Sequence, residues 1–276
     1  MNTTVLNFRE AKGQHKLVML TAYDYTTARR LDVEGVDAFL VGDSLGMVML
    51  GYADTLAVTM EDMVRHCAAV ARGTSHALVV CDMPYMSYHV RPEESVRNAG
   101  RLITEGRAQA VKLEGGAAFA PDIRAMVRAS IPVMGHLGLT PQSLNALGGF
   151  RVQGKTPEAA RRLLDDARAV EDAGAFSLVL ECVPAALAAR VSKALSIPVI
   201  GIGSGAGCDG QVLVWQDMAG MNQERVPRFV KRFGEVGEAL SDAARAYARE
   251  VRAGTFPDDE HCYPMPEGLE EALDRL

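Results

Sequence analysis

Eight short apolar segments recur along the chain, each followed by a polar cluster and then by a longer segment with helical spacing. They are nearly continuous in Val, Ile, Leu and Ala, as expected for parallel strands that are covered on both faces. The predicted strands are residues 17–23, 38–42, 77–81, 110–113, 131–135, 177–180, 197–202 and 212–215. The predicted helices include residues 59–72, 92–105, 121–129, 156–173 and 185–195. Eight such units in 276 residues predict an α/β fold of the (β/α)8 TIM-barrel type, with a doubly wound open sheet as the alternative.

The chain shows no linker and no change of composition, so we expect a single (β/α)8-barrel domain over residues 1–276. Residues 136–155, after the fifth predicted strand, are rich in Gly, Ser, Asn and Gln. They are predicted to form a long active-site loop, because long loops in compact domains are usually functional. A C-terminal helical tail is predicted from about residue 230. Such a tail either closes its own barrel or packs on a neighbouring subunit.

The charge and cysteine content exclude several classes of protein. The 35 Asp and Glu residues outnumber the 29 Lys and Arg residues, whereas a nucleic-acid-binding surface is normally basic. No apolar run reaches the roughly 18–20 residues that span a bilayer, and the first residues lack the pattern of a secretory signal. The five cysteines form no CxxC pair, which favours reduced thiols. We therefore predict a cytoplasmic protein without nucleic-acid or membrane partners.

Ionisable and hydroxyl side chains lie at or just after the ends of six of the predicted strands, at the end where a (β/α)8 barrel carries its chemistry. Each has a structural explanation when taken alone, such as a helix cap, a turn or a salt bridge. Together they would be costly to bury without a shared partner, and a metal ion with an anionic substrate would be such a partner. The residues are Tyr23, Asp24, Asp43, Ser44, Asp82, Lys112, Glu114, His136 and Glu181.

Asp43 and Asp82 follow consecutive predicted strands, which in a barrel are neighbours about 4.8 Å apart. Two carboxylates at such a separation repel each other unless a cation or a proton lies between them. Oxygen ligands without nearby Cys or His favour a hard ion such as Mg²⁺, which can stabilise the enolate of a bound 2-oxo acid. Lys112 is predicted to add a second positive charge, and Glu181, across the barrel, to act as the general base.

Residues 201–205 form a Gly-rich turn after the seventh predicted strand. The turn lacks the Lys-Ser/Thr pattern of a Walker motif. It predicts either a phosphate cradle or a place where the backbone approaches a substrate closely.

Several long motifs, in order from about Lys16 to Tyr263, resemble those of the ketopantoate hydroxymethyltransferase family. They are TAYDY at 21–25, VGDSLGM at 41–47, VKLEGG at 111–116, GHLGLTPQS at 135–143, GGFRVQG at 148–154, LECVP at 180–184, GIG at 201–203 and DGQ at 209–211. The resemblance implies a TIM barrel that transfers a hydroxymethyl group from 5,10-methylenetetrahydrofolate to 3-methyl-2-oxobutanoate. The product would be 2-dehydropantoate, in pantothenate biosynthesis. Because family members are cytoplasmic and typically decameric, with C-terminal helices exchanged within dimers, the resemblance also implies a homodecamer.

The resemblance assigns binding roles to the residues at the strand ends. Asp43 and Asp82 would ligate one Mg²⁺ ion per subunit, with Glu114 near the metal through water. The residues predicted to bind the oxo acid are Tyr23, Asp43, Ser44, Asp82 and Lys112.

Three residues are predicted to be catalytic. Glu181 would take the proton from C3 of the oxo acid, Lys112 would hold the charge of the enolate, and His136 would lie close to the incoming hydroxymethyl group. The reaction would be a metal-assisted enolisation followed by an aldol-type addition.

Three other functions fit part of the pattern. A carbon–carbon lyase of the phosphoenolpyruvate mutase or isocitrate lyase type uses a similar metal and oxo-acid site. Such lyases usually carry a Cys in a mobile loop, however, and residues 136–155 contain none. A Schiff-base aldolase would use Lys112 as its nucleophile. A non-catalytic metabolite-binding barrel would serve as a sensor or scaffold, and the presence together of a base, a carboxylate pair and a lysine argues against it.

Overall fold

The computed structural model describes residues 3–222 and 226–275, and the chain divides into two compact units. Unit 1 comprises residues 1–215 and 227–230, and unit 2 comprises residues 216–226 and 231–276. The expectation of a single domain over residues 1–276 is not tested by this division and stays a prediction.

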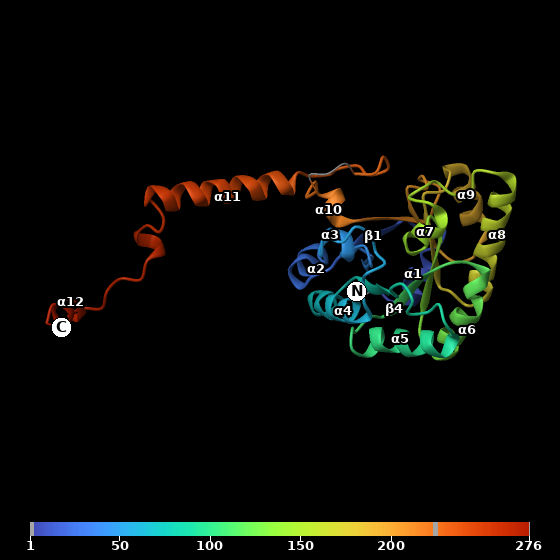
Figure 1. Cartoon of the computed structure of the whole chain (residues 1–276), viewed down its shortest axis with the longest axis horizontal. Helices are drawn as coiled ribbons and strands as arrows, with labels where there is room; N and C mark the ends of the chain where they lie inside the picture. The colour runs from blue at the N-terminus through green and yellow to red at the C-terminus, as the bar shows by residue number, and fades with distance from the viewer. Residues whose placement is uncertain (1–2, 223–225, 276) are drawn as a thin grey trace. The chain divides into compact units, whose positions relative to one another are not determined.

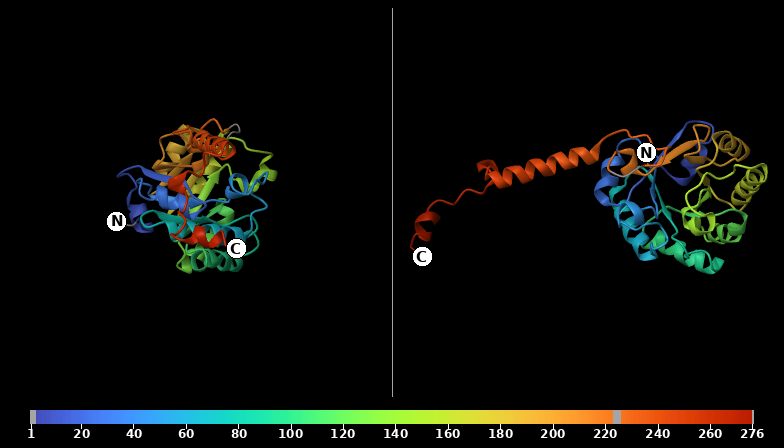
Figure 2. Two further views of the ribbon diagram at one scale, coloured as in Figure 1. Left: turned by 90° about the vertical axis from the view of Figure 1, so that its left-hand side faces the viewer. Right: turned by 45° about the horizontal axis from the view of Figure 1, so that its top comes forward.

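Unit 1 is a closed barrel of parallel strands in the order β1-β2-β3-β4-β5-β6-β7-β8, ringed by helices (Figures 1 and 2). The predicted TIM barrel is confirmed, and the doubly wound open sheet is excluded because β1 pairs with β8. Each strand overlaps a predicted one. The strands are β1 Leu17–Thr21, β2 Ala38–Val41, β3 Leu78–Asp82, β4 Ala110–Glu114, β5 Val133–Gly138, β6 Ser177–Glu181, β7 Val199–Ile202 and β8 Gly210–Leu213.

The helices between the strands pack an apolar face against the barrel. In α4 the hydroxyl of the cap residue Thr59 accepts a hydrogen bond from the backbone N–H of Asp62. This helix buries Met63, Cys67 and Val70, which lie on one helical face. The helices that begin in unit 1 are α1 Val5–Glu10, α2 Tyr25–Leu31, α3 Leu45–Val48, α4 Met60–Gly73, α5 Pro92–Thr104, α6 Ala120–Arg128, α7 Leu144–Leu147, α8 Pro157–Asp172, α9 Ala185–Ala194 and α10 Trp215–Met218, with 3-10 helices η1 Ala117–Phe119 and η2 Pro141–Ser143.

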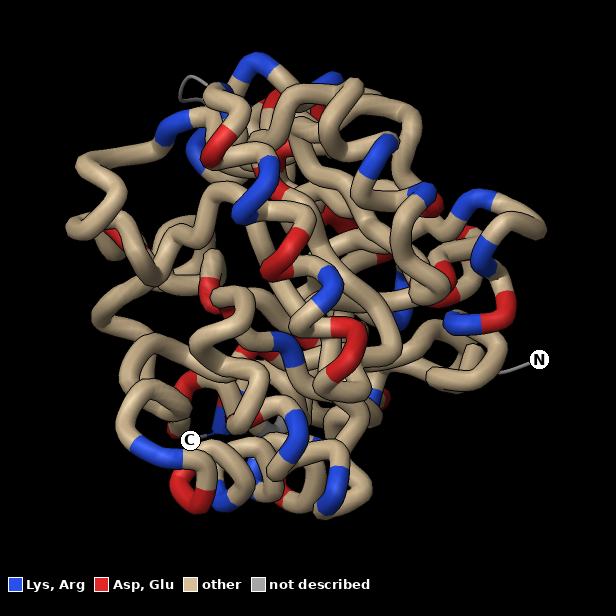
Figure 3. The backbone as a smooth tube through the Cα atoms, turned by 90° about the vertical axis from the view of Figure 1, so that its right-hand side faces the viewer, with Lys and Arg blue, Asp and Glu red and all other residues tan. Residues whose placement is uncertain are grey.

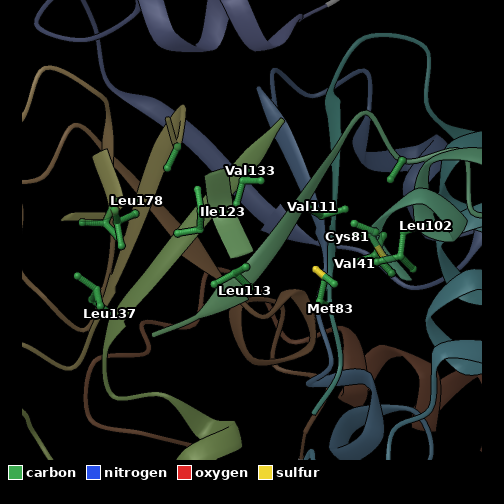
Figure 4. Packing of buried hydrophobic residues seen from close by; sticks show 14 of the residues in the cluster. Val41, Cys81, Met83, Leu102, Val111, Leu113, Ile123, Val133, Leu137 and Leu178 are labelled. Atoms are coloured by element: carbon green, nitrogen blue, oxygen red, sulfur yellow. The ribbon is translucent and has the colours of Figure 1, made fainter. Parts of the chain in front are cut away.

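Two hydrophobic clusters build the core of unit 1. The larger one fills the layer between strands and helices, where Cys81 and Val133 of the strands share a cluster with Leu102 of α5 and Ile123 of α6 (Figure 4). The smaller one lies inside the barrel and combines alternate strand residues with Phe8 of α1. The Phe8 ring meets that of Phe176 edge-on, at a centroid distance of 5.9 Å. Since successive residues of a strand face opposite sides, each of the strands β2 to β7 contributes buried residues to both layers.

Residues 136–155, predicted to be a long loop, are more ordered than expected. Strand β5 continues to Gly138, which pairs with Glu181 of β6. The helices η2 and α7 follow directly. The loop prediction was wrong for the first residues because the pairing with β6, which fixes the end of the strand, is not visible in local composition.

Unit 2 contains the predicted helical tail. Its helices are α11 Val236–Ala253, the 3-10 helix η3 Asp259–His261 and α12 Leu269–Leu273, so the tail begins slightly later than residue 230. Among the described residues α11 buries none of its side chains. Val236, Leu240, Tyr247 and Val251 are exposed and lie on one side of the helix because of their spacing.

In the view of Figure 3, Lys and Arg positions are interspersed with Asp and Glu positions along the described backbone. Within the described part of the chain, no helix combines the length and apolar character needed to cross a membrane.

Candidate active site

The polar residues at the strand ends continue the inner face of the barrel. Val80, Ala110, Met134 and Val179 belong to the cluster inside the barrel. Because side chains two positions apart on a strand share a face, Asp82, Lys112, His136 and Glu181 also face inward, one layer nearer the carboxyl ends of the strands. Glu114 lies one further step along β4. The sequence pattern therefore places an ionisable layer directly on top of an apolar one.

The register of β3 and β4 brings Asp82 beside Lys112. The Lys112 ammonium lies 3.0 Å from Oδ1 of Asp82, and both side chains are 4% exposed. Burial opposes the charged form of Lys112, but the charges of Asp82, Glu114 and Asp43 outweigh burial and raise the pKa of Lys112. Burial raises the pKa of Asp82 although Lys112 opposes the shift. Lys112 is thus held as a cation.

His136 of β5 links Glu114 with Glu181. In the register Glu114 and His136 are direct neighbours, and Nδ1 of His136 lies 3.3 Å from Oε1 of Glu114. On the other side of the ring, Nε2 lies 3.4 Å from Oε2 of Glu181. Burial and the charge of Lys112 lower the pKa of His136, but the contacts with Glu114 and Glu181 prevail and raise it to about 8.

The protonation of His136 is coupled to Lys112, whose Nζ lies 3.2 Å from Nδ1 of the ring. A neutral ring that accepts from Lys112 at Nδ1 carries its proton on Nε2, facing Glu181. A protonated ring donates from Nδ1 toward Glu114 instead. Burial alone would raise the pKa of Glu114, but the hydrogen bond with His136 helps to lower it.

Gln142, at η2, joins the carboxylates of two strands. Its Nε2 donates to Oδ2 of Asp43 at 2.8 Å and to the carbonyl oxygen of Met83 at 2.9 Å. Its backbone N–H donates to Oε2 of Glu114 at 2.9 Å. The Tyr88 hydroxyl donates to Oε1 of Gln142 at 2.6 Å. Gln142 therefore orients two of the predicted metal-site residues.

Gln142 and Tyr88 were not among the predicted site residues. Gln142 lies within the GHLGLTPQS motif, and its position shortly after a strand end was a usable signal. Tyr88 lies in the connection between β3 and α5 and had no comparable signal, because its contact with Gln142 joins residues that are far apart in the sequence.

Asp43 and Asp82 are close together, as predicted. The backbone N–H of Asp43 donates to Oδ2 of Asp82 at 3.1 Å. Burial raises the pKa of Asp43 well above its usual value, and the charges of Asp82 and Glu114 raise it further. The two carboxyl groups thus destabilise each other as anions.

This electrostatic imbalance fits a bound cation. Three buried carboxyl groups, those of Asp43, Asp82 and Glu114, surround the single ammonium group of Lys112. A hard divalent ion between oxygen ligands would remove the excess negative charge. Among the described residues, no set of three or more His, Cys, Asp or Glu side chains is arranged to hold a metal ion.

Ser44 and Tyr23 lie beside the carboxylates. The Tyr23 hydroxyl and Oγ of Ser44 are 2.8 Å apart. Burial raises the pKa of Tyr23 above its usual value, so this phenol stays neutral. Asp24, by contrast, does not join the site, because its side chain caps α2 by accepting from the backbone N–H of Thr27 at 2.9 Å.

The Gly-rich turn at residues 201–205 supports the neighbouring strand end. Ser204 accepts from the backbone N–H of Val183 at 3.2 Å and donates to the carbonyl oxygen of Leu180 at 2.8 Å. The two residues bonded to Ser204 flank Glu181 in the sequence, so these bonds hold the chain before and after it. A Cβ at Gly205 would come within 2.5 Å of Ala185, so this glycine permits close packing on α9.

Sequence comparison relates the whole chain to a known family of enzymes. The profile of the family described as ketopantoate hydroxymethyltransferase matches residues 2–259. A 3-methyl-2-oxobutanoate hydroxymethyltransferase from Clostridium novyi is 58% identical over 277 residues, covering 100% of both chains. One from Enterococcus faecalis is 57% identical over 274 residues, covering 99% of this chain and 100% of that protein.

Structure comparison finds similar barrels among lyases and hydrolases. A 2,3-dimethylmalate lyase of the phosphoenolpyruvate mutase/isocitrate lyase superfamily has a TM-score of 0.61 and 19% identity, covering 100% of this chain and 95% of that chain. A phosphonopyruvate hydrolase in complex with oxalate and Mg²⁺ has a TM-score of 0.62 and 13% identity, covering 100% and 96%. At these identities the likeness shows the fold alone.

Proposed function

The chain belongs to the ketopantoate hydroxymethyltransferase family, and we propose that it transfers a hydroxymethyl group from 5,10-methylenetetrahydrofolate to 3-methyl-2-oxobutanoate. The product is 2-dehydropantoate, an intermediate of pantothenate biosynthesis. The main support in the structure is one continuous line of contacts across the barrel, from Asp82 through Lys112 and His136 to Glu181. In the proposed reaction, the cation Lys112 and the carboxylate base Glu181 on this line act on the same small substrate.

Lys112, Ser44 and Tyr23 bind the oxo acid. The buried ammonium group of Lys112 offers positive charge to the substrate's carboxylate and keto oxygens. Ser44 offers a hydroxyl whose direction is set by its hydrogen bond with Tyr23. Such fixed partners reduce the entropy that binding costs and hold C3 of the substrate in place for reaction.

Asp43 and Asp82 would hold one Mg²⁺ ion, with Glu114 acting through water and Gln142 orienting the carboxylates. When bound, such an ion supplies Lewis-acid charge that stabilises the enolate form of an oxo acid. The excess of buried carboxyl groups in the site supports this assignment.

Glu181 takes the proton from C3, and His136 orients it. Glu181 is at the end of β6, and its carboxylate is 17% exposed and faces the ring of His136. A positioned base typically contributes about 10²–10⁴-fold to the rate. The carbanion at C3 then forms the new carbon–carbon bond to the one-carbon unit, whose two bonds to N5 and N10 of the folate break. Water supplies the hydroxyl group, and tetrahydrofolate leaves with the proton from C3 and the second proton of water on these nitrogens.

The structure gives less support to a Schiff-base aldolase. A lysine must be neutral to attack a carbonyl group. Here the surrounding carboxylates raise the pKa of Lys112 and keep it protonated. The family match likewise favours the transferase over a carbon–carbon lyase or a non-catalytic barrel.

We also propose a cellular compartment and an oligomeric state for the enzyme. The protein acts in the cytoplasm as a homo-oligomer, a decamer if it follows its family, and the exposed apolar side of α11 is available for contacts between subunits. Sedimentation analysis of the purified chain tests the subunit number.

A coupled assay tests the activity itself. The purified protein is incubated with 3-methyl-2-oxobutanoate, methylenetetrahydrofolate and Mg²⁺, and 2-dehydropantoate is measured. Deuterium incorporation at C3 of the oxo acid is followed in a parallel reaction without folate. We expect both activities, and an enzyme that forms no 2-dehydropantoate would contradict the proposal.

A further inference from the structure

A groove of about 610 Å³ opens between the first turns of α8 and α9. Its lining includes Gly154, Lys155, Ala160, Pro184, Leu187 and Arg190. None of these residues belongs to the site described above.

The groove lies at the catalytic end of the barrel. Helices α8 and α9 each begin after a strand has ended at that face, so their first turns border it. Pro184 is three residues after Glu181, a stretch of chain that spans no more than about 11 Å. The backbone N–H of Gln153 donates to the carbonyl oxygen of Cys182 at 2.9 Å, which fixes the chain leading to Lys155 against the chain leaving Glu181.

The floor of the groove is apolar. Pro184, Leu187 and Ala160 are half-buried. Gly154 has a φ of +74°, and a Cβ there would lie 2.7 Å from Cδ2 of Leu187. The glycine therefore lets the backbone lie directly on the apolar floor, and a side chain at this position would disturb it.

Two cations border this floor. Lys155 and Arg190 are exposed, and neither forms an ion pair or a hydrogen bond with the side chains that the structure describes. An apolar floor with two unpaired positive charges complements a ligand that combines a flat apolar body with carboxylates. The oxo acid is too small for this role, and its charge is met by Lys112 inside the barrel.

The geometry points to this groove as the binding site for the aminobenzoyl-glutamate portion of the reduced folate. This inference rests on the proposed function, which makes a reduced folate the one-carbon donor. The aminobenzoyl ring lies on Pro184 and Leu187, and the glutamyl carboxylates pair with Lys155 and Arg190. The pterin end, which carries the one-carbon unit, then extends toward Glu181 and His136.

The double variant Lys155→Gln/Arg190→Gln tests the assignment. The matched control is Arg168→Gln/Lys193→Gln, which removes one exposed cation from each of α8 and α9 but outside the groove. For both variants and the wild type, KM and kcat are measured with monoglutamyl and triglutamyl methylenetetrahydrofolate. Dissociation constants of the two tetrahydrofolates are measured by calorimetry, at low and high salt.

We expect the groove variant to raise KM and the dissociation constant for the triglutamyl folate about 3- to 10-fold, the size of one to two partly screened ion pairs. The preference for triglutamyl over monoglutamyl folate would shrink, and so would its dependence on salt. The control variant would resemble the wild type. KM for the oxo acid and the C3 exchange rate would not change, because the oxo-acid site is untouched. The charge reversal Lys155→Glu/Arg190→Glu would enlarge each effect.

An unchanged affinity for both folates in the groove variants would overturn the inference, as would an equal effect of the control variant. A change in the oxo-acid KM without one in the folate KM would assign the groove to the other substrate and also overturn it. A wild-type enzyme that forms no 2-dehydropantoate would instead contradict the proposed function, so the two failures are distinguishable.

Discussion

Gln142 donates a hydrogen bond of 2.8 Å to Asp43, and both side chains are buried. The same amide accepts from Tyr88, while the backbone N–H of Gln142 donates to Glu114. One residue of the β5–α8 connection thus sets the orientation of carboxylates from two other strand ends.

The first prediction concerns Gln142→Leu, which removes the amide but keeps a similar volume. We expect the affinity for Mg²⁺ to fall about 10- to 100-fold, as for other residues that orient metal ligands, and kcat to fall with it. Metal titration of activity and of tryptophan fluorescence measures the change. Tyr88→Phe serves as the control, since it leaves the bond from Gln142 to Asp43 in place and should have a smaller effect. An unchanged metal affinity in a folded Gln142→Leu enzyme would assign Gln142 a structural role alone.

The second prediction concerns Glu181→Gln. The amide keeps the shape of the side chain but cannot take a proton, so C3 deuterium exchange should fall by about 10²–10⁴-fold. Binding of the oxo acid, measured by calorimetry, should change little because Lys112 and Ser44 are untouched. Normal exchange in this variant would show that another group is the base.

The third prediction concerns the carboxylate pair. In Asp82→Asn we expect activity to lose its dependence on Mg²⁺ concentration and to drop to the level seen after EDTA treatment. The physical reason is that one of two direct oxygen anions is replaced by a neutral amide. Asp166→Asn is the control, because Asp166 lies on α8 and not at a strand end, and it accepts an exposed hydrogen bond from the backbone N–H of Ala117. A normal metal titration in Asp82→Asn would contradict the two-carboxylate site.

The fourth prediction concerns Lys112 as a nucleophile. Borohydride treatment in the presence of 3-methyl-2-oxobutanoate should leave the mass of the protein unchanged. The carboxylates around Lys112 raise its pKa, so the free amine needed for an imine is scarce. A mass increase located at Lys112 would support the Schiff-base alternative.

The fifth prediction concerns pH and stability at Asp32. This buried carboxylate accepts from the backbone N–H groups of Ser75, His76 and Ala77. Burial raises its pKa, but these bonds, that of Ala77 first, outweigh burial and lower it. A lowered folded-state pKa stabilises the fold above the unfolded-state value of about 3.9, and this stabilisation is lost as pH falls through the folded-state value.

We therefore expect Asp32→Asn to lower the free energy of unfolding by about 1–3 kcal/mol at pH 7. The difference from the wild type should shrink below about pH 4. Urea unfolding at a series of pH values measures it. A difference that is constant down to pH 3 would show that the charge of Asp32 does not contribute.

The local pattern of the sequence was enough to predict the barrel and the positions of most ionisable residues at the strand ends. A parallel strand covered on both faces is a continuous apolar run, and its carboxyl end is marked by the first polar residues after it. Asp82, Lys112, His136 and Glu181 could therefore be placed at one edge of the sheet. Because side chains alternate along each strand, all four of these side chains face the inside of the barrel.

The tertiary structure decided what depends on contacts between distant segments. Gln142 reaches Asp43 from a different strand end, and no local pattern marks a partner 99 residues away. Asp24 could have been a site residue or a cap, and its bond to Thr27 made it a cap. The end of β5 was fixed by pairing with β6. The sequence by itself determined which residues form strands and which end of the barrel carries the polar groups, because the hydrophobic pattern along a strand is a local property. The structure decided which polar groups meet, because hydrogen bonds and ion pairs form only where the closed barrel brings separate strand ends within about 3 Å of one another.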